Sequence, residues 1–598
     1  MRVTYLSLIL LAVQLVRGGA RANEPACDVL VAGGSLASLA AAVAAANASL
    51  ALSPSAPASV CLLEITDWLG GQATASGTSA IDLGATWANF PSNFPAAFAA
   101  FLLSPPLGPA GHNPGGCTVS TKCFLPALFV AWADALVATL PNLRVYRSTA
   151  VVGVSRDAVS GRVTGLDAVR RTPTPAHASG WDRLLSAALP DFYSGADSAY
   201  FTKEALTLPL AAAGVVIEAT EFGDVLLLGG LDVEQGAERA EAVGNVTEQA
   251  CGQATTLCYW TAWRSEAAPS PDPWPRGSDG GVPFEAPTAN STNATHARLW
   301  LDHALIWRRS AAANASDSDH VREGDVSLIN QAGLNDVDFV YLFQGVTEAR
   351  ATAAAGAYAG GVDLTALALV EARAYGSWHA LKAAVAAFMP AVAANFSLNA
   401  TAAGTQTGLA KMPYLRDTRR AAAGIEKFRL CHDFAAPANP GPGPPGCYDG
   451  ALARAEAAFS DEIEPGFHFI DSVALGAYGF DIHRLQNSTC VLPAYLQWGS
   501  TPAEARPYYI PWRALTHYEA PNLLLAGKTM AMSFYANAVT RLHPSEWSTG
   551  NAAGAGAALM AHHGWDSLEL YHNVSVLQAL LSSDVIGQPL KWNLTAAA

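Results

Sequence analysis

The side chains best suited to acid–base chemistry lie in residues 478–483, where Asp481 and His483 stand two positions apart. A histidine can accept a proton from an alcohol or an amine, and a neighbouring carboxylate can set its tautomer or its charge. Residues two apart in a strand point to the same side, so this spacing permits a shared face but does not require contact. We therefore take His483 and Asp481 as candidate catalytic residues, while a structural histidine in a hydrogen-bonded network would explain the same pattern.

Arginines form a second group of candidates, in a chain with 35 Lys and Arg against 50 Asp and Glu. Arg541 precedes a glycine-rich segment and could hold a substrate carboxylate or form an ordinary ion pair. Arg416, Arg419 and Arg420 have the spacing of residues on one helical face. For these three we favour pairing with acids across a domain interface over binding of an anionic substrate. Asn335 and Asp336 are further candidates for the lining of a pocket.

The elements that must position these residues begin with a nucleotide-binding pattern. Residues 28–32 predict an apolar strand, Gly33, Gly34 and Ser35 a tight turn that opens a helix, and residues 60–64 a second strand that ends in Glu64. This is the layout of a dinucleotide-binding βαβ unit, in which the helix N-terminus faces a pyrophosphate and the acid accepts hydrogen bonds from a ribose. Ser35 and Ser38 stand where the usual pattern has its second and third glycines.

The rest of the chain predicts an α/β protein with an insertion. We expect strands at 143–146, 150–154, 214–220 and 522–526, a hairpin over 155–169, and helices over 124–140, 351–403 and 550–559. A strand and a glycine-rich helix so far from the first unit indicate a discontinuous domain. We therefore predict a Rossmann-like domain (23–235 and 505–575) with a parallel sheet, helices and a small antiparallel sheet. A mixed α+β substrate domain (236–504) is inserted, with a surface loop near 265–295 and a C-terminal tail at 576–598.

The N-terminus predicts export. Arg2 precedes an apolar run at residues 6–16, and Ala20-Arg21-Ala22 has the small-x-small form of a cleavage site, so residues 1–22 are expected to be a signal peptide. The apolar run is too short to span a bilayer, and no later segment has a transmembrane pattern. Ten N-x-S/T sequons agree with a secreted or lumenal glycoprotein. The net charge of −15 disfavours nucleic acid and anionic membranes as partners.

Nine cysteines in an oxidising compartment indicate disulfides. The close pairs are the expected bridges: Cys117 with Cys123, Cys251 with Cys258, and Cys431 with Cys447. We expect Cys61 to be an inert buried thiol in a core strand, and Cys27 and Cys490 either to pair or to stay free. No cysteine has a flanking histidine or a Cys-x-x-Cys spacing, so we expect no metal site.

Taken together, the motifs resemble the FAD-dependent oxidoreductases of the glutathione-reductase-like superfamily over about residues 28–562. The matching segments are residues 64–72, which end in Gly70-Gly71-Gln72, and residues 219–224, 416–420, 478–483, 509–513 and 550–554. The resemblance implies FAD as the cofactor. Since no histidine or cysteine lies at an obvious attachment point, we expect the FAD to be dissociable.

The resemblance also implies which residues contact FAD: Gly33, Gly34, Ser35, Ala37, Ser38, Glu64, Gly70, Gly71, Gln72, Val151, Thr220, Gly223, Gly527, Gly550, Asn551, Ala552 and Ala553. Gly70 and Gly71 would let the backbone approach a flat ligand, and Ser35 could donate its hydroxyl to a phosphate. Residues 550–553 would direct a helix N-terminus at the N1–C2=O edge of the flavin. Close packing of small residues would explain the same helix.

These features predict a secreted FAD-dependent oxidoreductase that acts on a small organic molecule. An oxidase with O₂ as electron acceptor is favoured, because the compartment is poor in NADPH and no second glycine-rich nucleotide turn is visible; a dehydrogenase with another acceptor stays open. Arg541, close to the flavin, could also stabilise its reduced form. The alternative is a non-catalytic glycoprotein on a degenerate flavin fold, which Ser35 and Ser38 favour and the retained Glu64 disfavours.

Overall fold

The structure is a computed structural model that describes residues 22–103, 113–237, 252–263, 293–317, 319–431, 468–479, 481–483 and 507–595, with the single residues 107, 286, 288 and 485. Residues 1–21 of the predicted signal peptide, almost all of the loop near 265–295, and Cys251, Cys447 and Cys490 lie outside these ranges. Among the residues described, no helix has both the length and the apolar character needed to cross a membrane.

A parallel sheet forms the centre of the molecule. Its strand order is β4 (Leu143–Tyr146), β3 (Val60–Leu63), β2 (Cys27–Ala32), β7 (Phe201–Glu218) and β19 (Leu523–Leu525). The side chains of β3 and β19 are all buried, as expected for parallel strands that are covered on both faces. The predicted Rossmann-like sheet, completed by a strand from the far end of the chain, is confirmed.

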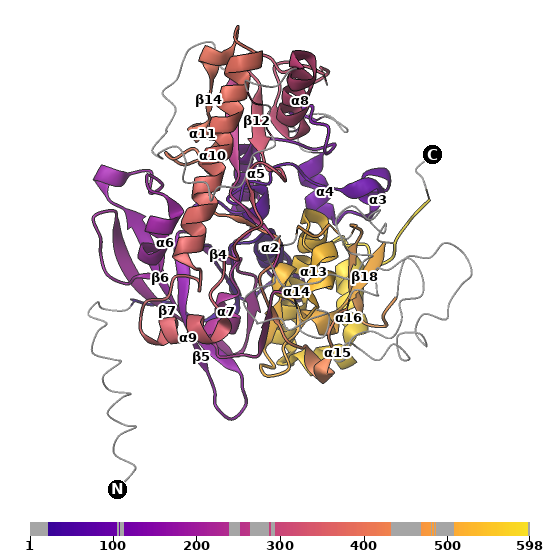
Figure 1. The fold of residues 1–598 in the computed structure, drawn as a ribbon. Coiled ribbons are helices and arrows are strands. Elements are labelled where there is room, and N and C mark those ends of the chain that lie inside the picture. Colours follow the sequence, from indigo (N-terminus) through magenta and orange to yellow (C-terminus); the bar gives the residue numbers. More distant parts are fainter. Residues whose placement is uncertain are drawn as a thin grey trace.

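The strand β7 also carries the predicted antiparallel sheet. It has 18 residues, and its first half pairs antiparallel with β6 (Val163–Pro173), which forms a hairpin with β5 (Thr149–Arg156). β1 (Ala22–Asn23) adds a short parallel edge to the same half of β7. One continuous strand therefore holds the two sheets together (Figure 1).

Two helices rich in small residues, α2 (Leu36–Leu52) and α14 (His543–His563), pack against each other over the sheet. A Cβ on Gly550 would lie 2.3 Å from the Ala37 carbonyl oxygen, and one on Gly554 would lie 2.1 Å from that of Ala41. The helices come so close that only glycine fits at these positions. Close packing, one of the two interpretations of this segment, is therefore what the structure shows for the two glycines.

The predicted start of this helix at Gly550 is wrong. The helix α14 begins at His543 with a proline in its first turn, a position where the fixed φ of proline suits a helix start. Gly550, Asn551, Ala552 and Ala553 consequently lie inside the helix and are buried. The N-terminal end of the helix lies instead at Leu542 and His543, and Leu542 lines the cavity described below.

The inserted region has its own small sheets, and its buried side chains share one core cluster with Ile65, Trp181 and Phe192 of the Rossmann-like part. A four-stranded antiparallel sheet has the order β11 (Arg309–Ala311), β12 (Val326–Ile329), β10 (Tyr259–Trp263), β14 (Phe396–Leu398), and a three-stranded sheet the order β13 (Asp336–Val337), β9 (Thr255–Thr256), β15 (Tyr414–Leu415). The helices α8 (Ala294–Trp307) and α10 (Leu364–Phe388) flank them at the top of Figure 1. This mixed α+β region is the predicted insert.

The remaining elements connect and cover these parts. They are α3 (Gly84–Asn89), α4 (Ala96–Leu102), α5 (Pro126–Ala138), α6 (Leu185–Tyr193), α7 (Asp224–Leu228), β8 (Val233–Gln235), α9 (Val346–Ala354), α11 (Ala400–Ala403), β16 (Arg419–Ala421), β17 (Ser472–Gly476), β18 (Tyr508–Pro511), α13 (Phe534–Thr540), α15 (Ser567–His572) and α16 (Val574–Ser582). The helix α5 confirms the prediction for residues 124–140. The prediction of helices over 351–403 is confirmed for most of that segment, which also contains β14.

The predicted helical face of arginines is wrong. Arg416 directly follows β15, and Arg419 and Arg420 lie in β16, which pairs antiparallel with β8. Their spacing matched a helical period, but this segment is fully buried and pairs with distant strands. Tertiary pairing therefore overrides the local periodicity.

The cysteine predictions are corrected in part. The Cys117–Cys123 bridge is confirmed, but Cys61 is bonded to Cys27 instead of being a thiol, because β2 and β3 are neighbours and bring the two Cα atoms to 6.0 Å. Cys258 is a free, buried thiol, so its predicted bridge to Cys251 is wrong. Cys431 is disulfide-bonded, while its predicted partner Cys447 lies outside the described residues.

Candidate active site

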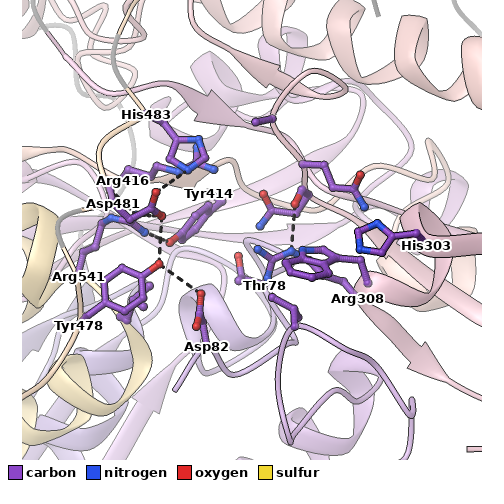
Figure 2. A pocket seen from close by; sticks show the side chains of 16 residues that line it. Thr78, Asp82, His303, Arg308, Tyr414, Arg416, Tyr478, Asp481, His483 and Arg541 are labelled. Atoms are coloured by element: carbon purple, nitrogen blue, oxygen red, sulfur yellow. Dashed lines mark hydrogen bonds and ion pairs between the residues drawn. The ribbon is translucent and has the colours of Figure 1, made fainter. Parts of the chain in front are cut away.

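A cavity of about 430 Å³ lies where the insert meets the Rossmann-like part. The Rossmann-like part contributes Thr78, Asp82, Arg541 and Leu542; the insert contributes His303, Trp307, Arg308, Asn330, Tyr414 and Arg416, and residues 478–483 contribute Tyr478, Asp481 and His483. Figure 2 shows His483, Asp481, Tyr478 and Arg541 toward one side of the cavity, and His303 and Arg308 toward the other. The three predicted catalytic residues are thus brought together.

His483 lies between two carboxylates. Its Nδ1 is 2.6 Å from Asp336 Oδ2, and its Nε2 is 3.1 Å from Asp481 Oδ1. An ionised carboxylate can only accept hydrogen bonds, so both contacts are satisfied only when the ring carries two protons. Both ring nitrogens therefore face carboxylates of the protein, and the role of His483 as a base stays a prediction.

Asp481 is the centre of the polar network. Its Oδ2 accepts hydrogen bonds from Arg541 Nη2 at 2.9 Å and from the Tyr478 hydroxyl at 3.0 Å. Burial alone would raise the pKa of this carboxyl, but the charges of His483 and Arg541 outweigh burial and hold the pKa well below its usual range. Asp481 is therefore a permanent anion between two cations.

Arg541 forms the ion pair that the sequence left open. Besides Asp481, its Nη1 donates to the Tyr414 hydroxyl at 2.5 Å. Burial lowers the pKa of this guanidinium, but Tyr414 and Asp481 more than compensate and raise it, so the group stays charged. Its charge is already matched by a carboxylate of the protein.

The other predicted arginines are also matched from within the protein. Arg416 pairs with Asp336 at 3.1 Å and Arg420 with Asp417 at 2.6 Å, both acids of the inserted region. Arg419 donates at 2.8 Å to the carbonyl oxygen of Phe222, which lies after β7. Pairing with acids is thus observed for two of the three. Arg419 and Arg420 both reach across to the Rossmann-like part, since Arg420 Nε donates to the Met532 carbonyl oxygen at 3.1 Å. Asp336, predicted to line a pocket, lies behind Arg416 and His483; Asn335 bonds to backbone carbonyls inside the insert.

Glu64 lies directly after β3, as predicted. Its Oε1 accepts hydrogen bonds from the Thr66 backbone N–H at 2.9 Å and hydroxyl at 3.0 Å, while Oε2 is buried without a hydrogen-bond partner. Burial raises the pKa of this carboxyl to about 8. A buried acceptor with no donor costs stability, and the two hydroxyls of a ribose would supply the missing donors.

The two serines in the first turn bond within the protein. Ser35 Oγ donates to the Ala219 carbonyl at 2.7 Å and accepts from the Ser38 N–H at 3.2 Å as the N-cap of α2. Ser38 Oγ donates to the Ser35 carbonyl at 2.7 Å and accepts from the Gly34 N–H at 3.2 Å. The Ser35 hydroxyl therefore ties the ends of β2 and β7 together instead of pointing its proton at a phosphate.

The glycines of the predicted cofactor set have tight surroundings. A Cβ on Gly33 would lie 2.5 Å from the Leu63 carbonyl oxygen, and one on Gly71 (φ 47°) 2.5 Å from the Ser35 Cα. The absence of a side chain on Gly71 lets this loop pack on the turn at residues 33–35. Gly70, directly before it, has a φ of 107°, a backbone angle that favours glycine. Gly527 (φ 64°) follows β19 and would place a Cβ 3.1 Å from that of Ala37.

Thr220, Gly223 and Val151 lie on the far side of β7. The Thr220 N–H donates to Glu218 Oε1 at 2.5 Å, and its hydroxyl accepts from the Asp224 N–H at 2.9 Å. Gly223 (φ 68°) caps α7 and packs against Arg419, and Val151 is buried in β5. The ends of β2, β3 and β7 therefore lie together at the carboxyl edge of the sheet, the edge where open α/β sheets bind nucleotides.

Beside the cavity, two further buried acceptors have no partner. Gln72 Nε2 donates to the Arg541 carbonyl at 3.2 Å, which leaves Gln72 Oε1 without a hydrogen bond. Burial lowers the pKa of His543 to about 3, and its Nε2 lies 3.0 Å from the Thr78 carbonyl, so the neutral ring carries its proton there. Nδ1 is then an acceptor without a donor. These two acceptors suit a flat ring that carries N–H groups, and Glu64 suits the hydroxyls of a ribose. The residues present therefore suit FAD.

Asp82, Arg308 and Tyr414 are among the cavity residues that sequence reasoning missed. Asp82 lies in a short segment between glycines, Arg308 beside the buried Arg309, and Tyr414 in a two-residue strand. None of them belongs to a periodic pattern. Tyr414 alone carried a signal, since it stands two residues before the matched segment 416–420.

The chain matches the family described as FAD dependent oxidoreductase over residues 28–180 and 196–581. Among solved structures, it is similar to the quinol fumarate reductase FrdA of E. coli (9% identity, 94% of this chain and 74% of that chain, TM-score 0.27). It is also similar to THI4 of Thermovibrio ammonificans (12% identity, 40% and 75%, TM-score 0.19) and to CabE, an aromatic hydroxylase from angucycline biosynthesis (13% identity, 55% and 48%, TM-score 0.23). The search of curated proteins finds no match.

Proposed function

The chain belongs to the family of FAD-dependent oxidoreductases, and from this premise we propose that it is a secreted oxidase. Its substrate would be a small organic molecule held in the cavity beside Arg541. The observation that carries the proposal is the position of this cavity: it joins a network of proton-bearing side chains to the residues whose buried acceptors suit FAD.

The reaction we propose is the oxidation of an alcohol or an amine. The substrate CH–XH group, where X is O or N, loses a hydride from carbon and a proton from X, and a C=X double bond forms. Bound FAD would accept the hydride at N5 and pass two electrons to O₂, which with two protons becomes H₂O₂.

The proton acceptor on the protein would be Asp82. This half-buried carboxylate lines the cavity, lies 3.3 Å from the Tyr478 hydroxyl through Oδ2, and has no salt bridge to any described residue. His483 and Asp481 would act as positioning residues, since His483 holds Asp481, and Asp481 holds Arg541. The Tyr478 hydroxyl lies within hydrogen-bond distance of both carboxylates and would hold Asp82 beside Asp481.

Two features support a secreted enzyme that uses O₂. The N-terminal 22 residues have the pattern of a signal peptide, and two disulfides lie within the described residues, as expected for an oxidising compartment. NADPH is scarce outside the cytosol, which favours O₂ as the electron acceptor.

The test uses protein secreted by a eukaryotic host and purified with its flavin. A panel of alcohols and amines is added without oxygen, and the flavin absorbance is followed. We expect one class to bleach the flavin, air to restore the colour, and one H₂O₂ to appear per substrate oxidised. Bleaching that O₂ does not reverse, but an artificial electron acceptor does, would overturn the oxidase proposal in favour of a dehydrogenase.

The role of Asp82 is tested separately with Asp82→Asn. We expect kcat to fall by about 10²- to 10⁴-fold, with the flavin content unchanged, because a general base contributes about this much. The pH profile should lose its acidic limb. Unchanged kcat and an unchanged profile would assign the proton transfer to another group.

A further inference from the structure

Arg308 is the third arginine that lines the cavity, and its surroundings differ from those of the other two. It follows α8 as the C-cap residue, and its Nε donates to the Asn330 carbonyl at 3.0 Å. This bond orients the guanidinium and leaves both Nη groups available. The guanidinium lies on the side of the cavity opposite Tyr478 and Arg541 (Figure 2).

The charge of Arg308 is not matched from within the protein. Arg416 has Asp336 at 3.1 Å and Arg541 has Asp481 at 2.9 Å, whereas Arg308 has no carboxylate within salt-bridge distance among the residues that the structure describes. A half-buried cation without a counter-ion is costly, because burial removes part of its hydration. The Arg308 side of the cavity therefore has one positive charge that no carboxylate of the described residues balances.

Asn330 provides a second polar group at the same place. Its side chain is 3% exposed and lines the cavity, yet its Oδ1 has no hydrogen-bond partner. Amide oxygen and nitrogen are interchangeable by a flip of the side chain, so Asn330 can present an N–H to a ligand oxygen. The rings of His303 and Trp307, 5.2 Å apart, form the adjoining wall.

We propose that the substrate is a small organic monocarboxylate whose carboxyl group binds Arg308 and Asn330. This inference rests on the proposed function and adds the substrate class. The two Nη groups match the two oxygens of a carboxylate, and a single unmatched cation suits one negative charge better than the two of a phosphate. The carboxylate would lie on the Arg308 side, and the carbon to be oxidised would face Asp82, Tyr478 and Arg541 on the other side (Figure 2).

The proposal is tested by ligand binding to the flavin-loaded protein, without turnover. Acetate, propionate and benzoate are titrated against their neutral amides, with the flavin absorbance spectrum as the readout. We expect at least one acid to bind tighter than its amide, and more weakly as the ionic strength rises. Arg308→Gln should weaken that acid by roughly 10- to 100-fold, the amide by less than about twofold, and Arg308→Lys should restore part of the loss.

Arg298→Gln is the matched control. Arg298 lies on the same helix, pairs with Asp302 at 2.6 Å and is partly exposed, so its loss changes the net charge equally without touching the cavity. It should leave binding of the acid unchanged. Amides that bind as tightly as the acids, or an Arg308→Gln protein that binds acids like the wild type, would overturn the assignment. Oxidation of neutral substrates only, with H₂O₂ released, would overturn it too and leave the oxidase proposal intact.

Discussion

The carboxyl group of Glu64 is expected to have opposite effects on the stability of the FAD-free protein and on the binding of FAD. Burial raises its pKa to about 8, so the FAD-free protein favours the neutral form near neutral pH. A ribose that donates hydrogen bonds to Oε2 would favour the ionised form instead. A residue that binds a cofactor well can therefore destabilise the protein that lacks the cofactor.

We predict opposite effects of Glu64→Gln on affinity and stability. The affinity for FAD should fall by about tenfold, because a charge-assisted hydrogen bond is lost. In the FAD-free wild type, the unfolded chain loses its Glu64 proton at about pH 4.5 and the folded chain only at about pH 8, so this residue lowers stability as pH rises between them. The FAD-free variant should thus equal the wild type near pH 4.5 and be about 2–4 kcal/mol more stable near pH 8.

Flavin titration and urea unfolding at several pH values measure the two effects. Glu371→Gln is the control, because burial also raises the pKa of Glu371, to about 7, but this residue binds Ser186 far from the nucleotide turn. It should alter the pH dependence of stability and leave FAD affinity unchanged. A Glu64→Gln protein with wild-type FAD affinity would remove Glu64 from the cofactor site.

Asp481 holds two cations together, and we predict that Asp481→Asn lowers the free energy of unfolding by roughly 1–3 kcal/mol. The change leaves the buried Arg541 without its carboxylate; the effect is moderated because the Asp481 side chain is 28% exposed. Urea unfolding of the flavin-loaded protein measures it. Asp134→Asn, which breaks an exposed pair with Arg147, should cost less than about 0.5 kcal/mol. Equal losses in the two variants would contradict a central role for Asp481.

At the scale of elements, the contact between α2 and α14 fixes the distance between the turn at residues 33–35 and the cavity. The helix α2 starts at the turn that holds Ser35, and α14 starts at His543, beside the cavity. Because the two helices touch backbone to backbone at Gly550 and Gly554, their separation has little tolerance.

We therefore predict that Gly550→Ala destabilises the protein by about 1–3 kcal/mol, although alanine is the better helix former. The added Cβ would lie 2.3 Å from the Ala37 carbonyl oxygen, so the helices must move apart. Thermal unfolding measures the loss, and flavin content should fall with it. His562→Ala, at an exposed position of the same helix, should stay within about 0.5 kcal/mol of the wild type. A stabilised Gly550→Ala protein would show that the contact is looser than described.

At the scale of the whole molecule, strands and aromatic rings from distant parts of the chain pack together. The strand β7 belongs to both sheets, β19 arrives from residue 523 to complete the parallel sheet, and Trp592 packs on Trp87 with 4.6 Å between ring centroids. Residues 576–582 of the predicted tail belong to α16, and the rings near the C-terminus cover the N-terminal part. The disulfide Cys27–Cys61 reinforces the same region by linking β2 and β3.

We predict that the two described disulfides contribute unequally. In the chain-entropy account, a bridge with a sequence separation of 34 is worth about 3.7 kcal/mol, and one with a separation of 6 about 2.2 kcal/mol. The double variant Cys27→Ala/Cys61→Ala should therefore lose more stability than Cys117→Ala/Cys123→Ala, as measured by urea unfolding of secreted protein. The reverse order would mean that packing around the cysteines outweighs loop closure.

Local patterns determined a large part of this protein from the sequence alone. The turn at Gly33, the strand that ends in Glu64 and the hairpin of β5 and β6 depend on neighbouring residues, whose periodicity and backbone preferences act over short distances. The family motifs identified FAD for the same reason, because each is a continuous segment. His483, Asp481 and Arg541 were also found this way.

Only the tertiary structure decided what these residues do. Asp336 reaches His483 across 147 positions, and this ring lies between two carboxylates. The arginines at 416–420 became strand residues because distant strands pair with them, and Cys61 found Cys27 because β2 and β3 are adjacent. Charge balance depends on neighbours in space, so Arg308, the arginine of the cavity that has no carboxylate partner among the described residues, became visible only when the cavity was assembled.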